Sequence, residues 1–165
     1  MTGVADSATG KTLELLSAPV GINAQLAAIA SGTGALLAEV GAKQMMAQNV
    51  AIELAERSSE VQYPAVHVYC ERLSNSQREK FRTFSGKAQM AVEVRYSQDR
   101  LEGIEGRVRG YADAVARVLE GSLGDWGDGM FYGGGYDVAF GAVKRGGRNF
   151  VQVARVTFEV EVSRS

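Results

Sequence analysis

The stretch FVQVARVTFEVEV, residues 150–162, decides the fold class of this chain. Apolar side chains occupy nearly every second position, and polar or charged side chains stand between them towards the end. A period of two places successive side chains on opposite faces of a β-strand, so the stretch predicts a long final strand with one buried and one wet face. Its buried face is Phe150, Gln152, Ala154, Val156, Phe158, Val160 and Val162, and its wet face is Arg155, Thr157, Glu159 and Glu161. The strand exceeds the usual length, so we expect part of it to pair beyond this domain.

The clearest helical pattern lies upstream, over residues 100–120. Apolar residues recur there at the spacing that places them on one stripe of a helix. The stripe comprises Ile104, Val108, Tyr111, Val115, Val118 and Leu119, opposite Arg107, Arg109, Asp113 and Arg117. Asp99 followed by Glu102 is similar to a capping box, and Gly121 stands where a left-handed C-terminal cap is expected. The local sequence thus predicts both ends of this helix.

Three further stretches alternate like strands. Residues 63–70 do so after Pro64, which suits the start of a strand, and residues 87–96 alternate most regularly of all. Residues 136–140 alternate just before residues 144–148, which predict a basic hairpin tip leading into the final strand. These patterns predict four principal strands, arranged around the long helix.

The N-terminal third predicts short helices. Residues 1–10 are rich in small residues and predict a flexible arm. Helices are then predicted over residues 12–17, 23–30 and 42–57, and the third of them ends at the pair Ser58 and Ser59. Residues 11–165 then form a single domain, with a helical part over 11–60 and the sheet plus the long helix over 61–165. The predicted fold class is α+β, with an about four-stranded, mainly antiparallel sheet packed by one long helix and shorter N-terminal helices.

Composition limits the classes of partner. The chain has 165 residues and a formal net charge of -1, which gives no general attraction to nucleic acid or anionic lipid. The single cysteine, Cys70, cannot form an internal disulfide, so we expect folding in a reducing cytoplasm. Residues 15–38 carry no charge, but proline, glycine and polar residues interrupt them, so neither a membrane span nor a signal peptide is predicted.

Motifs for catalysis or cofactor binding are weak. Residues 9–12, TGKT, lack the upstream glycine and the preceding strand of a phosphate-binding loop. His67 and Cys70 are the sole residues of their kinds, which are too few for a zinc site, and strand alternation places them on opposite faces. We therefore predict no catalytic residue, cofactor or metal, and no enzyme. The alternative of another class is a small ligand-binding or hydrolytic α+β domain using His67.

The candidate contact residues lie in two segments. The glycine-rich stretch 121–135 contains large aromatic residues that either fill their own loop or anchor a partner. The basic hairpin tip offers cations for a protein surface or for phosphate. The predicted protein-interface residues are Trp126, Phe131, Tyr132, Lys144, Arg145 and Arg148.

From residue 63 to residue 162 the chain resembles the tail terminator, or tail completion, proteins of long-tailed bacteriophages and prophages. The likeness is carried by residues 63–69, YPAVHVY, and 91–95, AVEVR, which look like the first two strands of that family. It is also carried by residues 106–115, GRVRGYADAV, which look like its long helix, and by residues 150–160, FVQVARVTFEV, which look like its final strand.

The resemblance implies a structural virion protein without catalytic activity. Such a protein forms a homo-oligomeric ring, commonly a hexamer, on the last ring of tail tube protein, where it ends tube growth and provides the surface for head joining. The implied partners are the chain itself, the tail tube protein and a head-completion or connector protein, with DNA only passing through the pore and no membrane contact. The implied location is the virion tail or neck, after synthesis in the host cytoplasm. The alternative within this class is a head-completion, neck or other minor tail protein.

The residues themselves are compatible with a ring. Ring contacts are heterologous, and a long final strand with a free edge suits pairing with a neighbouring subunit. Near-neutral net charge, with separate basic and acidic segments, would let DNA pass without sticking.

Overall fold

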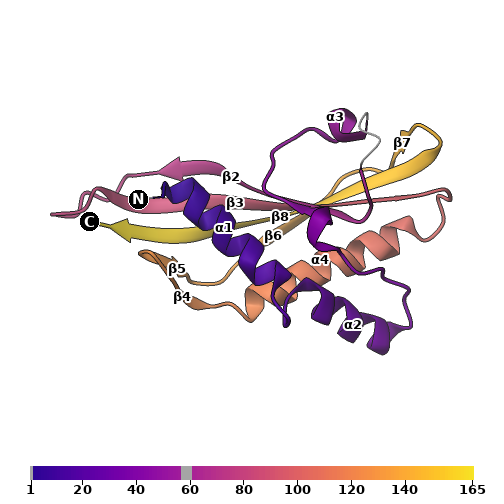
Figure 1. The fold of residues 1–165 in the computed structure, drawn as a ribbon, viewed down its shortest axis with the longest axis horizontal. Helices are drawn as coiled ribbons and strands as arrows, with labels where there is room; N and C mark the ends of the chain where they lie inside the picture. Colours follow the sequence, from indigo (N-terminus) through magenta and orange to yellow (C-terminus); the bar gives the residue numbers. More distant parts are fainter. Residues whose placement is uncertain (1, 57–60) are drawn as a thin grey trace.

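The computed structural model of this chain describes residues 2–56 and 61–165. Strand β8, Asn149–Arg164, lies at the centre of its sheet. One edge of β8 pairs antiparallel with β3, Phe84–Gln98, and the other edge pairs in turn with β7, β6 and β5. The long final strand is therefore confirmed, but its predicted free edge is wrong because short strands of the same chain occupy it (Figure 1).

Among the described residues the sheet has eight strands in the order β1-β2-β3-β8-β5-β4, with β6 and β7 also paired to β8. The further strands are β1, Met45–Met46; β2, Ala65–Ser74; β4, Gly124–Gly127; β5, Met130–Tyr132; β6, Asp137–Phe140; and β7, Lys144–Gly146. The sheet is mixed, because β1 runs parallel to β2 while the other pairs are antiparallel. The predicted four-stranded, mainly antiparallel sheet is thus wrong. Sequence analysis missed β1, β4, β5 and β7, which are short and lie in segments whose sequence shows no clear alternation.

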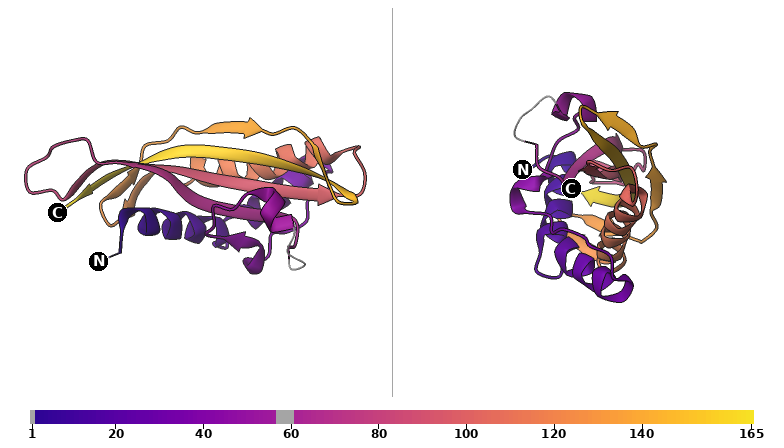
Figure 2. Two further views of the ribbon diagram at one scale, coloured as in Figure 1. Left: turned by 90° about the horizontal axis from the view of Figure 1, so that it is seen from above. Right: turned by 90° about the vertical axis from the view of Figure 1, so that its right-hand side faces the viewer.

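Helices α1, Val4–Ser17, and α4, Ile104–Glu120, pack against one face of the sheet, and α2, Ile22–Thr33, packs mainly against α4 (Figures 1 and 2). The class α+β is confirmed, but in the described residues α1 covers the sheet together with the long helix α4. Register explains which face is inside: Val92 of β3 lies opposite Val156 of β8 and Val68 of β2, and all of them are buried. The odd-numbered residues of β3 and β8 form the outer face.

Helix α1 corrects the predicted flexible arm over residues 1–10. It begins at Val4, and Ala8, Thr12 and Leu16 are buried against the sheet. The Thr12 hydroxyl donates to the Ala8 carbonyl at 2.8 Å, so even the polar side chain on this face is satisfied within the helix. Small residues, which look like loop composition, here allow the helix backbone to approach the strands closely.

The predicted helix over residues 42–57 is also wrong. This segment contains a 3₁₀ turn, Ala42–Gln44, then β1, and then the short helix α3, Ile52–Glu56. Pairing with β2 overrides the helical spacing, and the Gln44 side chain donates to the Pro64 carbonyl at 2.9 Å. The predicted end at Ser58 and Ser59 lies outside the described residues.

Helix α4 is confirmed, but its predicted caps are not. It begins at Ile104 after Gly103, whose φ of 80° is left-handed, and no side chain caps this end. The Gln98 side chain instead donates to the carbonyls of Arg100 and Glu102, at 2.6 and 2.7 Å, and orders the preceding turn. Gly121 is the C-terminal cap, yet its φ of -83° is right-handed.

One edge of β2 pairs with β3, and the other edge pairs with β1 only at Val66 and His67. Beyond His67 this second edge has no strand partner among residues 2–56 and 61–165. A bulge between Cys70 and Arg72 interrupts its ladder, and Glu71 and Arg72 place charges along it. Bulges and charges are features that keep an edge strand from pairing with other chains. In the described part of the chain no single helix is long and apolar enough to cross a membrane, although α1 and α2 together pass that test as a bent pair.

Candidate functional site

Two of the predicted interface aromatics lie inside the protein. Residues 124–132 form the β4–β5 hairpin rather than an open loop, and they turn Trp126 and Tyr132 towards the helices, where they are 7% and 1% exposed. Both rings contact Phe158, at centroid distances of 6.1 and 5.5 Å. The polar atoms are satisfied locally, because Trp126 donates to the Ser122 carbonyl and Tyr132 to the Gly135 carbonyl. These two aromatics therefore fill the core and do not form an interface.

Phe131 points the other way. It lies between Trp126 and Tyr132 in the hairpin, but its side chain is on the outer face and its exposed fraction is 48%. It is opposite Glu161 of β8 on one side and Asp125 of β4 on the other, and both carboxylates are exposed. Phe131 thus remains available to a partner.

The basic hairpin tip forms as predicted, with β7 turning into β8 through Gly147, whose φ is 64°. Lys144 lies 3.4 Å from Glu53 of α3, and the Arg145 guanidinium lies 5.7 Å from the ring centroid of Phe150. The pKa of the exposed Glu53 carboxyl is lowered. The larger cause is a hydrogen bond to the backbone of Glu53 itself, and the next is the hydrogen bond from Lys144. Two of the three predicted cations thus have partners within the chain, and Arg148 is exposed at the tip.

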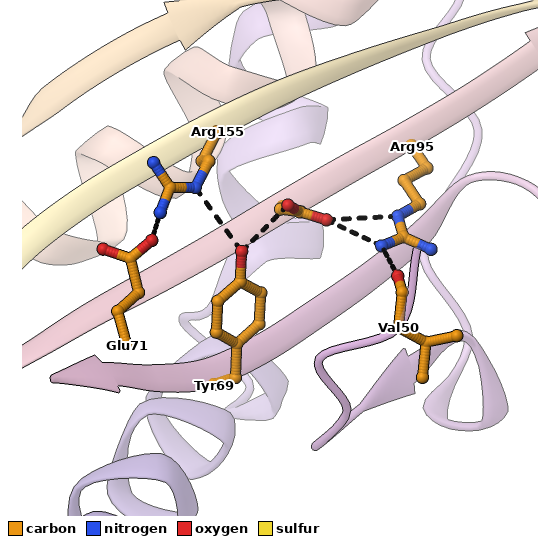
Figure 3. Close-up of polar contacts among 6 residues, drawn as sticks. Val50, Tyr69, Glu71, Arg95 and Arg155 are labelled. Atoms are coloured by element: carbon orange, nitrogen blue, oxygen red, sulfur yellow. Dashed lines mark hydrogen bonds and ion pairs between the residues drawn. The ribbon is translucent and has the colours of Figure 1, made fainter. Parts of the chain in front are cut away.

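A polar network crosses the outer face of the central strands (Figure 3). Tyr69 of β2 donates to Glu93 of β3 at 2.9 Å, and Arg95 donates to the other oxygen of Glu93 at 2.7 Å. Arg155 of β8 forms an ion pair with Glu71 and lies 3.4 Å from the Tyr69 hydroxyl. Charges of opposite sign therefore alternate along the network.

The network also fastens the segment before α3. Arg95 donates to the carbonyl of Val50, so a buried guanidinium joins the sheet to a loop that has no strand partner of its own (Figure 3). Burial raises the pKa of the Tyr69 hydroxyl, which stays protonated and able to donate at neutral pH. With its carboxylates paired to guanidinium groups, this network is suited to holding strands and loop together, and it presents no activated nucleophile.

His67 lies at one end of this network. It is 2% exposed, and its Nδ1 has no hydrogen-bond partner among the described residues. Burial, and then the positive charge of Arg95, lower the pKa of the imidazole, while Glu93 and a backbone contact with Gln48 oppose this. Cys70 faces the core, so the predicted separation of His67 and Cys70 on opposite faces is confirmed. Within residues 2–56 and 61–165 no group of three or more potential ligands could hold a metal ion.

Sequence analysis missed a second exposed aromatic, Phe81. It lies in the turn between β2 and β3, is 93% exposed, and has a φ of 62°. The polar composition of residues 71–82 indicates only a turn, so it gives no signal for this side chain. The polar network was missed for another reason: its members were recognisable as a wet strand face, while their pairing depends on strand register.

Comparison with known proteins found no matching family model and no significantly similar curated protein.

Proposed function

We propose that this chain is a structural subunit of a ring that caps the tail tube of a long-tailed phage, ends tube growth and offers a surface for head joining. The tail assignment rests on the resemblance of residues 63–162 to tail terminator proteins. The ring assignment rests on one observation in the structure, the position of the large exposed apolar side chains. Many of them lie on hairpins and at the rim of the sheet, namely Leu73, Phe81, Phe131, Tyr136 and Phe140.

Exposed aromatics at a rim suit contacts with other proteins. Aromatic side chains are the residues that most often anchor protein interfaces. Here they lie in separate places, with Phe81 on the β2–β3 turn and Phe131 on the outer face of the β4–β5 hairpin. Two different contact surfaces on one subunit are what a head-to-tail ring requires.

The polar network supports a structural rather than a catalytic role for the sheet. It joins β2, β3, β8 and the loop at Val50 through paired charges. In this proposal the partners are copies of the same chain, the tail tube protein and a head-completion protein, and the location is the virion. Head completion or another neck position is the second candidate, because the same rim would serve it.

A small ligand-binding or hydrolytic domain is the candidate from another class, and one observation favours it. The Nδ1 of buried His67, which has no hydrogen-bond partner within the described part of the chain, borders a hollow that Lys43, Gln48 and Val50 also line. If this candidate holds, His67→Ala abolishes function while leaving the oligomeric state unchanged. If the ring proposal holds, His67→Ala leaves tube capping intact.

Electron microscopy of tail tubes tests the ring proposal. Tubes are assembled from the tube protein encoded beside this gene, with and without the full chain. We expect added protein to stop growth and to leave an extra ring at one end of each tube. Tubes that lengthen equally and carry no cap would overturn the proposal and favour head completion. Leu36→Ala is a suitable control variant, because Leu36 is 81% exposed but lies away from the sheet rim.

A further inference from the structure

The turn between β2 and β3, residues 75–83, projects beyond the end of the sheet (Figure 2, left). Phe81 is almost fully exposed on it, in a left-handed conformation that bulky side chains rarely adopt. Arg78, Lys80 and Arg82 are exposed on the same turn, and Glu79 lies 3.9 Å from Arg82, so Arg78 and Lys80 carry most of its positive charge. We call Arg78, Lys80, Phe81 and Arg82 the basic tip. It presents an aromatic anchor within a positive rim.

The outer face of the sheet carries the opposite arrangement around Phe131. Asp125, Phe131 and Glu161 are neighbours across β4, β5 and β8 on one face. Glu159 lies further along the same face of β8, and Asp137 of β6 is opposite Thr157 on that face. Lys87 is a cation within this set and already contacts Glu159, at 3.1 Å. We call Asp125, Phe131, Asp137, Glu159 and Glu161 the Phe131 face, which presents an aromatic centre within a negative rim.

We propose that the basic tip of one copy docks on the Phe131 face of the next copy. This inference rests on the proposed ring and names the contact that builds it. Charge complementarity identifies the partner, because one chain carries both halves of the contact while its formal net charge is only -1. The basic tip lies on the turn that extends past the end of the sheet, whereas the Phe131 face lies on strands β4, β5, β6 and β8, so the contact joins two different surfaces. Such a contact is heterologous and can close into a ring.

The physical role of each part follows from its chemistry. Opposed charges at an exposed rim steer association and fix orientation, and they are weakened by salt. Phe81 and Phe131 supply apolar surface, and burying that surface in the contact would stabilise the complex. Phe81 is already 93% exposed in the single chain, so its ring is accessible before any partner binds.

Charge reversal with rescue tests the contact in the full chain. The tip variant is Arg78→Glu with Lys80→Glu, and the face variant is Asp137→Lys with Glu161→Lys. Sedimentation velocity over a concentration series measures self-association in free solution, and electron microscopy measures ring formation on tube ends. We expect each variant alone to weaken association at least about tenfold, and an equal mixture or the combined variant to recover to within about threefold of wild type.

A control matched to the tip variant makes the same change of net charge elsewhere, because it also replaces two cations with two glutamates. Arg100→Glu with Arg109→Glu reverses two exposed cations at the opposite end of the molecule and on α4, and we expect it to associate like wild type. Rings that form normally in both reversal variants would overturn this contact and leave the ring proposal standing. Absence of rings in the wild-type protein would instead overturn both. Loss of association without rescue, together with wild-type binding to duplex DNA that the tip variant loses, would assign the tip to phosphate and overturn the contact.

Discussion

At the scale of single residues, neighbouring aromatics in the β4–β5 hairpin have opposite environments. Trp126 and Tyr132 contact Phe158 in the core, whereas Phe131, between them in sequence, is half exposed on the outer face. The difference follows from strand alternation, since Phe131 is opposite Glu161 and Met130 is opposite Val162. The same hairpin thus supplies both core and surface.

Trp126→Ala and Phe131→Ala form a matched pair that tests this division. We expect Trp126→Ala to lower the free energy of unfolding by about 3–5 kcal/mol, because it leaves a cavity beside Tyr132 and Phe158. We expect Phe131→Ala to change it by about 0.5 kcal/mol or less, as for most surface substitutions. Urea denaturation followed by circular dichroism measures both. Equal losses for the two variants would contradict the assigned environments.

His67 makes stability depend on pH. Its pKa in the folded protein is lowered by burial and by Arg95, so the unfolded chain binds a proton more readily than the native state does. Stability from this group is therefore present above the ordinary histidine pKa of about 6.5 and is lost as the pH falls below it. We expect the melting temperature of wild type to fall across this range.

His67→Gln is the control for that pH effect. It cannot titrate, so we expect a flatter dependence of melting temperature on pH just below neutrality. The remaining titratable groups near His67, Glu93 and Arg95, are unchanged in this variant. If wild type and His67→Gln show the same slope, His67 is not the group responsible.

At the scale of elements, α1 shows how a segment of small residues becomes structural. Its exposed position Gly10 has nothing within 4 Å of where a Cβ would be added. Glycine in a helix interior is less favourable than alanine by roughly 0.5–1 kcal/mol. We therefore expect Gly10→Ala to stabilise the protein by that amount in thermal and urea unfolding. No change would indicate that residues 4–10 are a flexible arm after all.

Gly86 of β3 is the counterpart of Gly10. A Cβ added there would collide with the Ser74 carbonyl oxygen of β2. Gly86→Ala must therefore shift the backbone of one strand, and we expect it to destabilise the protein where Gly10→Ala stabilises it. The opposite signs of these two substitutions separate a helix that tolerates a side chain from a strand pair that does not.

At the scale of the whole molecule, β3 and β8 join two apolar clusters. The larger cluster contains Trp126, Tyr132 and Phe158, and the smaller contains Ile104, Val108, Ala112 and Ala154. Both clusters pack on the same pair of strands, which are matched along their full length. This shared pair of strands connects the two clusters physically.

Unfolding of the two clusters should therefore be a single event. We expect Ile104→Ala to lower the free energy of unfolding by about 2–5 kcal/mol and to shift the same transition that Trp126→Ala shifts. Near- and far-ultraviolet circular dichroism should give coincident curves for both variants. Two separate transitions, with each variant moving only one, would show that the clusters unfold independently.

The long elements were predictable because their own periodicity specifies them. β3, β8 and α4 show a repeated pattern that burial on one face imposes, whereas the alternation that predicted β6 does not reflect burial, since Phe140 is 48% exposed. The helix over residues 42–57 failed although Met46, Val50 and Leu54 have helical spacing. In the structure Met46 pairs with His67, and Leu54 is 61% exposed, so tertiary pairing overrode a local preference.

The candidate site was predictable in part. Lys144, Arg145 and Arg148 do lie on a hairpin tip, and Phe131 is exposed. Trp126 and Tyr132 could not be told from Phe131 by composition, because a glycine-rich stretch shows no clear alternation. Phe81 was missed since exposure and a left-handed φ are properties of a turn's conformation and not of its residue types.

The sequence alone determined an α+β protein with a long final strand, an amphipathic helix before it and a wet sheet face that carries charged side chains. Only the tertiary structure decided that short strands fill the second edge of β8, that α1 begins at Val4 and that opposite charges meet around Tyr69. The physical reason is the distance along the chain over which each interaction acts. Periodicity records burial along one element, whereas short strands, strand register and cross-strand ion pairs exist only once distant segments lie side by side.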